Sequence, residues 1–309
     1  MKLRVGTRKS ELALNQTYWV VEKLKKYYPD IEIEIHKLTT KGDEILDKTL
    51  SKIGGKALFL KEIQNALLAG DIDLAVHSMK DIPTETPSEL EICAVTKRLD
   101  PRDVLITKDN NSTLDELQLG SFVGTSSLRR ASQLKAYRKD LQITPVRGNI
   151  NTRLEKLQNS DKLDGIVLAK AGLMRADLTD LIAQEIPEDV IVPCVGQGAL
   201  GIEIKADNDK LREKLSVLND ENSRTAIYSE RTFLNQLGGS CHVPVGGLGR
   251  LTEKGLELTG VVAELEGSKV LKETLIGSKD YPVDLGQELA YKLISQGAKE
   301  ILDSVKNKG

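Results

Sequence analysis

Short apolar runs that pass directly into a polar turn and then a helix recur along this chain of 309 residues. The first run, Leu3–Val5, leads into a turn that holds Arg8, and the spacing that follows predicts a helix over Ser10–Tyr28. Ile31–Ile35 then alternates apolar and charged residues, as a half-exposed strand does. This order predicts a β-α-β unit, and its recurrence predicts an α/β fold. In open α/β sheets the turns at the carboxyl ends of strands line the ligand crevice.

Arginines follow the predicted strands throughout this pattern. Phe122–Gly124 and Ile143–Val146 each precede two of them at a helix start, and Gly165–Ala169 precedes one after a short helix. Guanidinium groups form paired hydrogen bonds with carboxylates and phosphates. These side chains therefore predict a polyanionic ligand, although a solvated loop charge is the alternative for the first of them. The arginines are Arg8, Arg129, Arg130, Arg147, Arg153 and Arg175.

The helix start after Phe122–Gly124 is the most favourable of these places for an anion. Small hydroxyl residues at Thr125–Ser127 leave backbone N–H groups exposed. Arg129 and Arg130 in the first turn oppose the helix dipole and repel each other. A bound anion would relieve both effects, and a solvated basic face is the alternative.

A second kind of strand end carries Lys80 and Asp81. They follow the apolar run Ile72–Val76, and such a neighbouring pair is most often a surface ion pair that contributes ~0–1 kcal/mol. Because Lys80 and Asp81 lie at the carboxyl end of a predicted strand, we also consider them candidate site residues. Before it, Thr39–Lys56 is polar, rich in glycine and without periodicity, which predicts a long mobile loop of the kind that forms lids.

Cys241 lies in the glycine-rich stretch Gly238–Gly247, between a predicted helix and a predicted strand. Glycines let the backbone come close to whatever the sulfur carries. The alternative is a small buried cysteine. A nucleophile pair with His242 is not favoured, because neighbouring residues of an extended chain point to opposite sides.

Composition excludes several classes of protein. Lys and Arg number 44 against 46 Asp and Glu, a net charge of -2, so no global basic field favours nucleic acid. We find no apolar run of transmembrane length and no signal-peptide core at the N-terminus. Cys93, Cys194 and Cys241 are too irregularly spaced for a disulfide framework or a metal knuckle. We therefore expect a cytoplasmic chain without a metal.

Several ordered motifs together resemble the porphobilinogen deaminase family over the whole chain. They are Gly54-Gly55-Lys56, His77-Ser78-Met79-Lys80-Asp81-Ile82-Pro83, Thr125-Ser126-Ser127-Leu128-Arg129-Arg130, Arg147-Gly148-Asn149, Gly196-Gln197-Gly198-Ala199-Leu200-Gly201 and the Cys241 loop. Two departures are Ala57, where the family has glycine, and Cys194, where alanine is usual.

The resemblance implies an α/β fold of three domains. Two would be α/β domains like the lobes of periplasmic binding proteins, with residues 1–98 and 194–218 in the first and 99–193 in the second. Residues 219–309 would form a small α+β domain with a three-stranded antiparallel sheet, to which Leu256–Val261 and Val270–Leu275 are suited, and a closing helix over Leu285–Val305. Ala199–Ile204 is expected to rejoin the first sheet.

The resemblance also implies an activity and a set of site residues. The chain would join four porphobilinogen molecules on a dipyrromethane cofactor, attached to Cys241 by a thioether, and release hydroxymethylbilane. Asp81 would be the acid/base carboxylate. Further cofactor-binding residues would be Ser10, Lys80, Thr125, Ser126, Arg129, Arg130 and Gly148. Substrate carboxylates would bind Arg8, Arg147, Arg153 and Arg175, and the lid would hold Lys52, Lys56 and Phe59.

Two rival functions use the same arginines. A two-lobed anion-binding protein would hold a ligand with them and keep Cys241 as a structural residue. A nucleic-acid binder is disfavoured by the near-neutral charge and the lack of interleaved aromatic residues. We expect a monomer whose partner is porphobilinogen, with no nucleic acid and no membrane. The mass of the intact protein separates the hypotheses, because only the first adds a covalent dipyrromethane.

Overall fold

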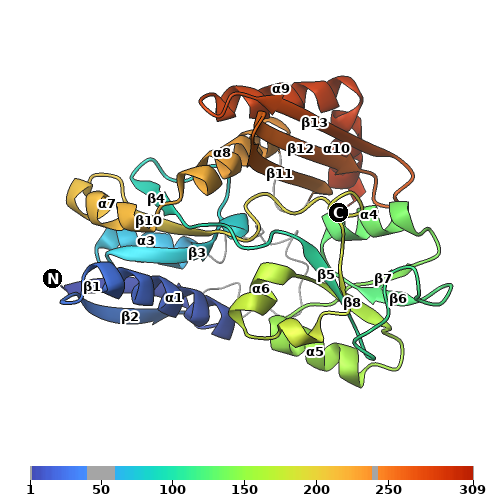
Figure 1. The fold of residues 1–309 in the computed structure, drawn as a ribbon, viewed down its shortest axis with the longest axis horizontal. Helices are drawn as coiled ribbons and strands as arrows, with labels where there is room; N and C mark the ends of the chain where they lie inside the picture. Colours follow the sequence, from blue (N-terminus) through green and yellow to red (C-terminus); the bar gives the residue numbers. More distant parts are fainter. Residues whose placement is uncertain (1, 40–59, 239–242, 309) are drawn as a thin grey trace. The chain divides into compact units, whose positions relative to one another are not determined.

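The computed structural model describes residues 2–39, 60–238 and 243–308 (Figure 1). The predicted lid with Lys52, Lys56 and Phe59, and the loop position of Cys241, lie outside the described residues. The chain divides into two compact units. One comprises Met1–Leu99 and Ala199–Thr225, and the other comprises Asp100–Gly198 and Ala226–Gly309.

The first unit contains a five-stranded sheet in the order β2-β1-β3-β10-β4. Strands β1 and β3 are parallel neighbours, and β10 runs antiparallel to both β3 and β4. The prediction that the chain returns to this sheet after residue 198 is therefore confirmed. The strands are β1 (Lys2–Arg8), β2 (Glu32–Leu38), β3 (Leu74–Ser78), β4 (Leu90–Val95) and β10 (Leu200–Lys205), and the helices are α1 (Glu11–Tyr27), α3 (Lys61–Ala69) and α7 (Asp209–Leu215), with 3₁₀ turns at Met79–Asp81 and Ser216–Leu218.

Apolar side chains from β1, β3 and α1 form the core of this unit. Val5, Val20 and Leu74 are almost fully buried there, and they come from segments whose apolar spacing the sequence shows. Helix α1 ends at Tyr27 before Pro29, which cannot supply the N–H that a further helical turn requires.

The second unit contains another five-stranded sheet, in the order β7-β6-β8-β5-β9. Here β6 is parallel to β7 and to β8, while β5 is antiparallel to β8 and β9. Order and directions match those of the first sheet, so the predicted pair of α/β folds is confirmed. The strands are β5 (Asp103–Thr107), β6 (Phe122–Gly124), β7 (Gln142–Thr144), β8 (Gly165–Ala169) and β9 (Gln184–Glu185), and the helices are α4 (Leu128–Tyr137), α5 (Ile150–Asn159) and α6 (Lys170–Arg175), with a 3₁₀ turn at Thr179–Leu181.

The remainder of the second unit is the predicted three-stranded antiparallel sheet, β11-β12-β13, with helices on one face (Figure 1). Phe233, Leu258 and Leu289 lie in the core between this sheet and its helices. Its strands are β11 (Val245–Thr252), β12 (Gly255–Ala263) and β13 (Val270–Gly277), and the helices are α8 (Glu221–Gln236), which begins in the first unit, α9 (Pro282–Ser295) and α10 (Ala298–Lys308).

The single closing helix predicted from the sequence is wrong. Helices α9 and α10 are separated at Gln296 and Gly297, and Gly297 has φ +102, a left-handed conformation that interrupts a helix. The apolar periodicity continues across the break, which is why the sequence indicated one helix.

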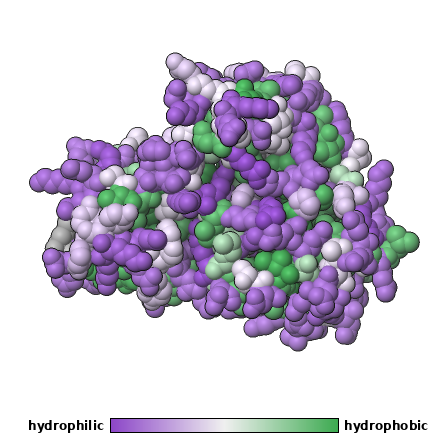
Figure 2. Space-filling view, viewed as in Figure 1, coloured by the Kyte–Doolittle hydropathy of each residue, from purple (hydrophilic) through white to green (hydrophobic). Residues whose placement is uncertain are grey.

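Hydrophilic residues dominate the face drawn in Figure 2, and apolar residues appear there in scattered groups. Within residues 2–39, 60–238 and 243–308, we find no helix both long enough and apolar enough to cross a membrane.

Candidate active site

Two neighbouring strand ends of the first unit carry predicted site residues. Arg8 is the last residue of β1, and Ser10 occupies the N-cap position of α1 two residues later. Lys80 and Asp81 lie in the 3₁₀ turn that follows β3, the parallel neighbour of β1. All four are half-buried. The structure thus brings Arg8, Ser10, Lys80 and Asp81 to one carboxyl edge of the sheet, as the sequence predicted.

The turn that holds Asp81 is fixed by its neighbours. Met79 is 2% exposed, and its N–H donates to the carbonyl oxygen of Ala199 at 3.0 Å. One residue earlier, the Ser78 hydroxyl and the Gln16 amide exchange hydrogen bonds of 2.9 and 3.1 Å. These contacts hold both the strand end and the start of the turn, so the Asp81 backbone has a defined place.

A buried polar cluster lies behind the same strand. His77 Nε2 lies 3.0 Å from Glu203 Oε2, and Gln64 donates to the other carboxylate oxygen of Glu203 at 2.8 Å. Glu203 on β10 is fully buried, so these partners replace the water that its carboxylate loses. The cluster joins α3 to the strand that precedes Asp81.

Three parallel strand ends of the second unit carry the other predicted residues. Thr125–Arg130 follows β6, Arg147–Arg153 follows β7, and Arg175 ends α6 after β8. Because β7, β6 and β8 are parallel neighbours, their carboxyl ends meet at one edge of the sheet. The structure brings these segments together as predicted.

Arg129 and Arg130 are buried beside a carboxylate that the sequence analysis did not identify. The two side chains are only 4% and 7% exposed, and Asp103 is fully buried. Arg129 Nη1 lies 2.7 Å from Asp103 Oδ2, and Arg130 Nη2 lies 2.7 Å from Oδ1. The two guanidinium groups also donate to the carbonyl oxygens of Val192 and Val167, both at 2.8 Å.

The charges of this cluster support one another. Burial opposes ionisation of Asp103, but Arg129 and Arg130 outweigh it, and the pKa of the carboxyl group lies well below its ordinary 3.8. Burial also opposes the charge of Arg129, and the attraction of Asp103 outweighs it and raises the pKa of that guanidinium. The repulsion between the arginines, for which we expected a bound anion, is relieved here by the chain's own Asp103.

Backbone and hydroxyl contacts define the turns around the arginines. Thr125 is buried and its hydroxyl accepts from the N–H of Ser127 at 3.2 Å, while Ser126 donates to the carbonyl oxygen of Val146 at 3.0 Å. Gly148 has φ +118, and a Cβ there would come within 2.6 Å of Thr152 Cγ2. Only glycine fits this position without strain.

Arg147, Arg153 and Arg175 are less enclosed than Arg129 and Arg130. Arg153 Nε donates to the carbonyl oxygen of Gly148 at 2.9 Å, which holds α5 to the turn before it. Arg175 Nη2 donates to the carbonyl oxygen of Gly198 at 2.7 Å. Burial lowers the pKa of Arg175 to about 10, so it stays protonated at neutral pH.

The sequence analysis also missed contacts of the return crossover, the segment of residues 186–199 between β9 and β10. Gln197 donates to Asp103 Oδ1 at 2.9 Å and to the carbonyl oxygen of Pro101 at 2.6 Å. Buried Glu230 accepts from the N–H groups of Gly196 and Gly249, both at 2.7 Å. The motif around Gln197 was noticed, but no local sequence signal reveals a partner 94 positions away.

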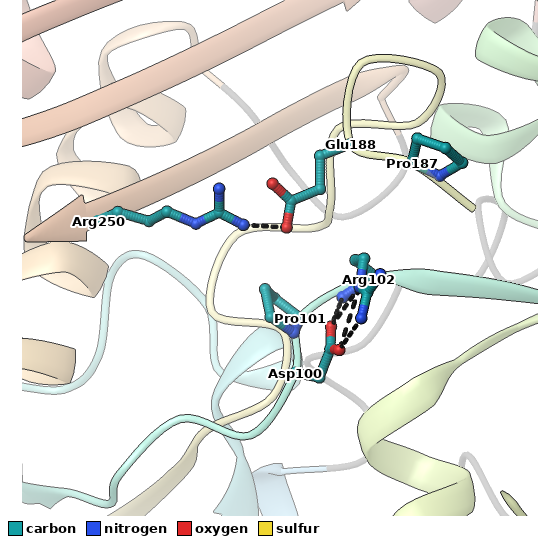
Figure 3. A pocket seen from close by; sticks show the side chains of 6 residues that line it. All are labelled: Asp100, Pro101, Arg102, Pro187, Glu188 and Arg250. Carbon is teal, nitrogen blue, oxygen red and sulfur yellow. Dashed lines mark hydrogen bonds and ion pairs between the residues drawn. The ribbon is translucent and has the colours of Figure 1, made fainter. Parts of the chain in front are cut away.

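A cavity of about 490 Å³ lies elsewhere in the second unit (Figure 3). Two ion pairs line it, Arg102 with Asp100 at 2.6 Å and Arg250 with Glu188. Its remaining lining residues are Pro101 and Pro187, and no predicted site residue takes part. In the described part of the chain, no three His, Cys, Asp or Glu side chains converge as a metal site.

Comparisons with known proteins agree with the sequence motifs. A family model described as "Porphobilinogen deaminase, dipyromethane cofactor binding domain" matches residues 3–213, and one described as "Porphobilinogen deaminase, C-terminal domain" matches residues 225–295. The chain is 62% identical to the porphobilinogen deaminase of Natranaerobius thermophilus over 99% of both chains. It is 50% identical to that of Geobacillus kaustophilus, over 98% of this chain and 97% of the relative.

Solved structures give a more distant likeness. The periplasmic VFT2 domain of Bordetella pertussis BvgS is 12% identical, with a TM-score of 0.42 over 70% of this chain and 86% of that domain. The methionine-binding protein MetQ is 14% identical, with a TM-score of 0.41 over 70% of this chain and 89% of that protein.

Proposed function

The chain belongs to the porphobilinogen deaminase family, and on this premise we propose how its residues divide the work. The activity is the deamination of four porphobilinogen molecules and their head-to-tail joining on a dipyrromethane primer, with hydrolytic release of hydroxymethylbilane. The observation that carries the assignment of residues is the clustering of charged side chains at parallel strand ends in both α/β sheets.

Asp81 is the acid/base carboxylate of the proposal. Departure of ammonia leaves a cationic pyrrole, which a nearby carboxylate stabilises, and joining the next ring requires a proton to leave. The hydrogen bond that holds Met79 at the start of the 3₁₀ turn supports this role. The carboxylate must face the nitrogen of one pyrrole after another, and this requires a defined position. Lys80, next to it, would bind carboxylates of the cofactor.

The described residues fit a cofactor that carries several carboxylates. When bound, dipyrromethane supplies the pyrrole carbon to which the first substrate is joined. Arg129, Arg130 and Asp103 together carry one net positive charge, which suits a ligand with carboxylate groups. We assign Arg129 and Arg130 to the cofactor.

The remaining assignments follow the same strand ends. Ser10, Thr125, Ser126 and Gly148 would contact the cofactor, and the conformation that Gly148 requires supports a close backbone approach there. Arg8, Arg147, Arg153 and Arg175 would bind acetate and propionate groups of the substrate. Lys52, Lys56 and Phe59 are proposed as lid residues, and Cys241 as the thioether anchor.

We further propose that the chain works as a monomer in the cytoplasm, without nucleic acid, in the three domains 1–98 with 194–218, 99–193 and 219–309. The net charge of -2 supports the absence of a nucleic-acid partner. Light scattering of the purified protein tests the monomer, and a stable dimer in solution would contradict it.

The mass of the intact purified protein tests the central proposal. We expect the chain mass plus one dipyrromethane, with the addition mapping to Cys241 after proteolysis. Cys241→Ser removes the thiol with little change of size, so this variant is expected to fold, lack the added mass and show no turnover. Cys194→Ser and Cys93→Ser are matched controls that should keep it. Unmodified Cys241 in a fully active preparation would exclude the covalent anchor.

A further inference from the structure

The turn between β12 and β13 packs closely against helix α4. Gly267 in this turn is buried and has φ +70. A Cβ at this position would lie 2.3 Å from the backbone nitrogen of Ala136 and 2.7 Å from the carbonyl carbon of Lys135. Beside this contact, Lys135 of the helix forms an ion pair with Glu266 of the turn. The C-terminal sheet and α4 thus meet backbone to backbone, where only glycine fits.

The C-terminal sheet also contacts α4 indirectly, through Val192, which binds α4 and packs against the sheet. The carbonyl oxygen of Val192 accepts from Arg129 at 2.8 Å, and its N–H donates to Gln133 Oε1 at 2.9 Å. The Val192 side chain packs with Leu248 and Val261 of the C-terminal sheet.

Glycines let the sheet approach this segment closely. A Cβ on Gly246 would come within 2.7 Å of the Val192 carbonyl oxygen. At the next residue of each segment, the N–H of Gly247 donates to the carbonyl oxygen of Pro193 at 2.9 Å. The residue that binds Arg129 is therefore itself fixed by the C-terminal sheet.

We propose that the C-terminal sheet positions the arginine pair: the β12–β13 turn and the contacts with Val192 together fix helix α4, and with it Arg129 and Arg130. The proposal rests on the function proposed above, in which these arginines bind the cofactor. It makes Gly267 a positioning residue that touches neither substrate nor cofactor.

Helix α4 is suited to transmit such a constraint. It spans only Leu128–Tyr137, so the Gly267 contact near its end and the arginines in its first turn lie on one rigid segment of about 1.5 Å rise per residue. A shift forced at Ala136 moves the whole helix against Asp103 and Val192. A displacement of about 1 Å of binding groups can cost ~10²-fold in rate.

Gly267→Ala tests the proposal, with Gly255→Ala as its matched control. Gly255 is the first residue of β12 and Gly267 lies in the turn after it; both have positive φ, and a Cβ on Gly255 would lie 2.4 Å from the Gly277 carbonyl oxygen. A Cβ would clash with backbone atoms at both positions, but at Gly255 the clash falls within the C-terminal sheet and at Gly267 it falls on α4. Gly267→Asn also introduces a Cβ that clashes with α4, but asparagine tolerates the left-handed conformation better than alanine does. This variant therefore separates the effect of the clash from that of backbone strain.

Three measurements on each full-length variant decide the matter: the fraction of protein carrying dipyrromethane by intact mass, kcat and KM, and the midpoint of thermal unfolding. We expect both variants at Gly267 to show lowered cofactor loading and a kcat/KM reduced about ten- to a hundredfold. Gly255→Ala should lower the unfolding midpoint and keep loading and KM close to wild type.

Normal loading and KM in both Gly267 variants would overturn the proposal. So would losses in Gly255→Ala that match those of Gly267→Ala at the same unfolding midpoint, because the effect would then reflect general destabilisation of the sheet. A wild-type protein without dipyrromethane would instead contradict the proposed function itself.

Discussion

Arg130 donates to a single carboxylate oxygen of Asp103 from both Nε and Nη2, at 3.1 and 2.7 Å. The other oxygen of Asp103 faces Arg129. One fully buried carboxylate therefore holds two guanidinium groups at the start of α4, and Gln197 holds that carboxylate from the return crossover. The arginines that we assign to the cofactor are thus set in position by the chain before any ligand binds.

Asp103→Asn is expected to destabilise the fold strongly. The amide cannot balance two buried positive charges, and loss of one partner of a buried ion pair costs roughly 3–5 kcal/mol in the free energy of unfolding. Urea denaturation at neutral pH measures the loss. Asp209→Asn removes a carboxylate of an exposed ion pair with Arg212 and should change stability little. Equal effects of the two substitutions would contradict the role given to Asp103.

The difference in the free energy of unfolding between wild type and Asp103→Asn should depend on pH. The pKa of Asp103 is lower in the folded protein than its ordinary 3.8, so its charge stabilises the fold fully above that value. This contribution is lost as the pH falls through the lower, folded-state pKa. Denaturation series at several acidic pH values should therefore show the two proteins converging as the pH is lowered below 3.8. A constant difference down to the lowest pH would contradict this.

The sequence predicted most of what depends on local pattern. Strands β6 and β8 have the predicted bounds, and the arginines stand at parallel strand ends as their positions indicated. Strand–helix alternation and apolar spacing are properties of neighbouring residues, so they can be read without knowing the fold.

What the sequence did not reveal depends on contacts between distant segments. Asp103 was not identified as a site residue, because nothing near it in the sequence indicates that Arg129 and Arg130 pack against it. The contact of Gly267 with α4 was missed for the same reason. The break between α9 and α10 is a local event, but the apolar residues on its two sides keep the phase of one helix.

Arg175→Leu should retain the cofactor and slow elongation. Arg175 ends α6 and takes no part in the ion pairs of Asp103 with Arg129 and Arg130, and at neutral pH its guanidinium is charged although burial lowers its pKa to about 10. Removal of one substrate-binding group should make intermediates with few added pyrroles accumulate. Mass spectra recorded after addition of substrate would show them as a ladder.

Arg212→Leu is the control for this variant, since Arg212 is a more exposed arginine that pairs with Glu91 in the first unit. It should turn over with a wild-type distribution of intermediates. A wild-type distribution in Arg175→Leu as well would remove Arg175 from the substrate site.

The number of free thiols provides a separate test of the covalent anchor. Burial, with the nearby charge of Glu91, raises the pKa of Cys93 to about 12, so this thiol should resist alkylation in the folded protein. Cys194 is half-buried, so in the folded protein it should be alkylated slowly, but faster than Cys93. Of the three cysteines, unfolded protein loaded with cofactor should offer only Cys93 and Cys194 to a thiol reagent. A third reactive thiol in that sample would contradict attachment at Cys241.

Asp81→Asn should separate cofactor assembly from turnover. The amide keeps the size of the side chain and accepts hydrogen bonds, but it neither offsets positive charge on a pyrrole nitrogen nor takes up a proton. A positioned acid/base group contributes ~10²–10⁴-fold in rate, so kcat should fall by a factor in or above that range. Intact mass should still show the cofactor, and the unfolding midpoint should stay near that of wild type.

Asp81→Glu and Asp71→Asn complete the comparison. Glutamate keeps the charge and moves it by one methylene, so this variant should lose less activity than the asparagine variant. Asp71 is an exposed carboxylate just before β3, the strand whose other end leads to Asp81. Its amide variant should turn over normally. If Asp81 served only as a surface partner of Lys80, both substitutions at Asp81 would leave the rate near wild type, because such pairs contribute only ~0–1 kcal/mol. Steady-state rates of the three variants, each with its cofactor content measured, distinguish these outcomes.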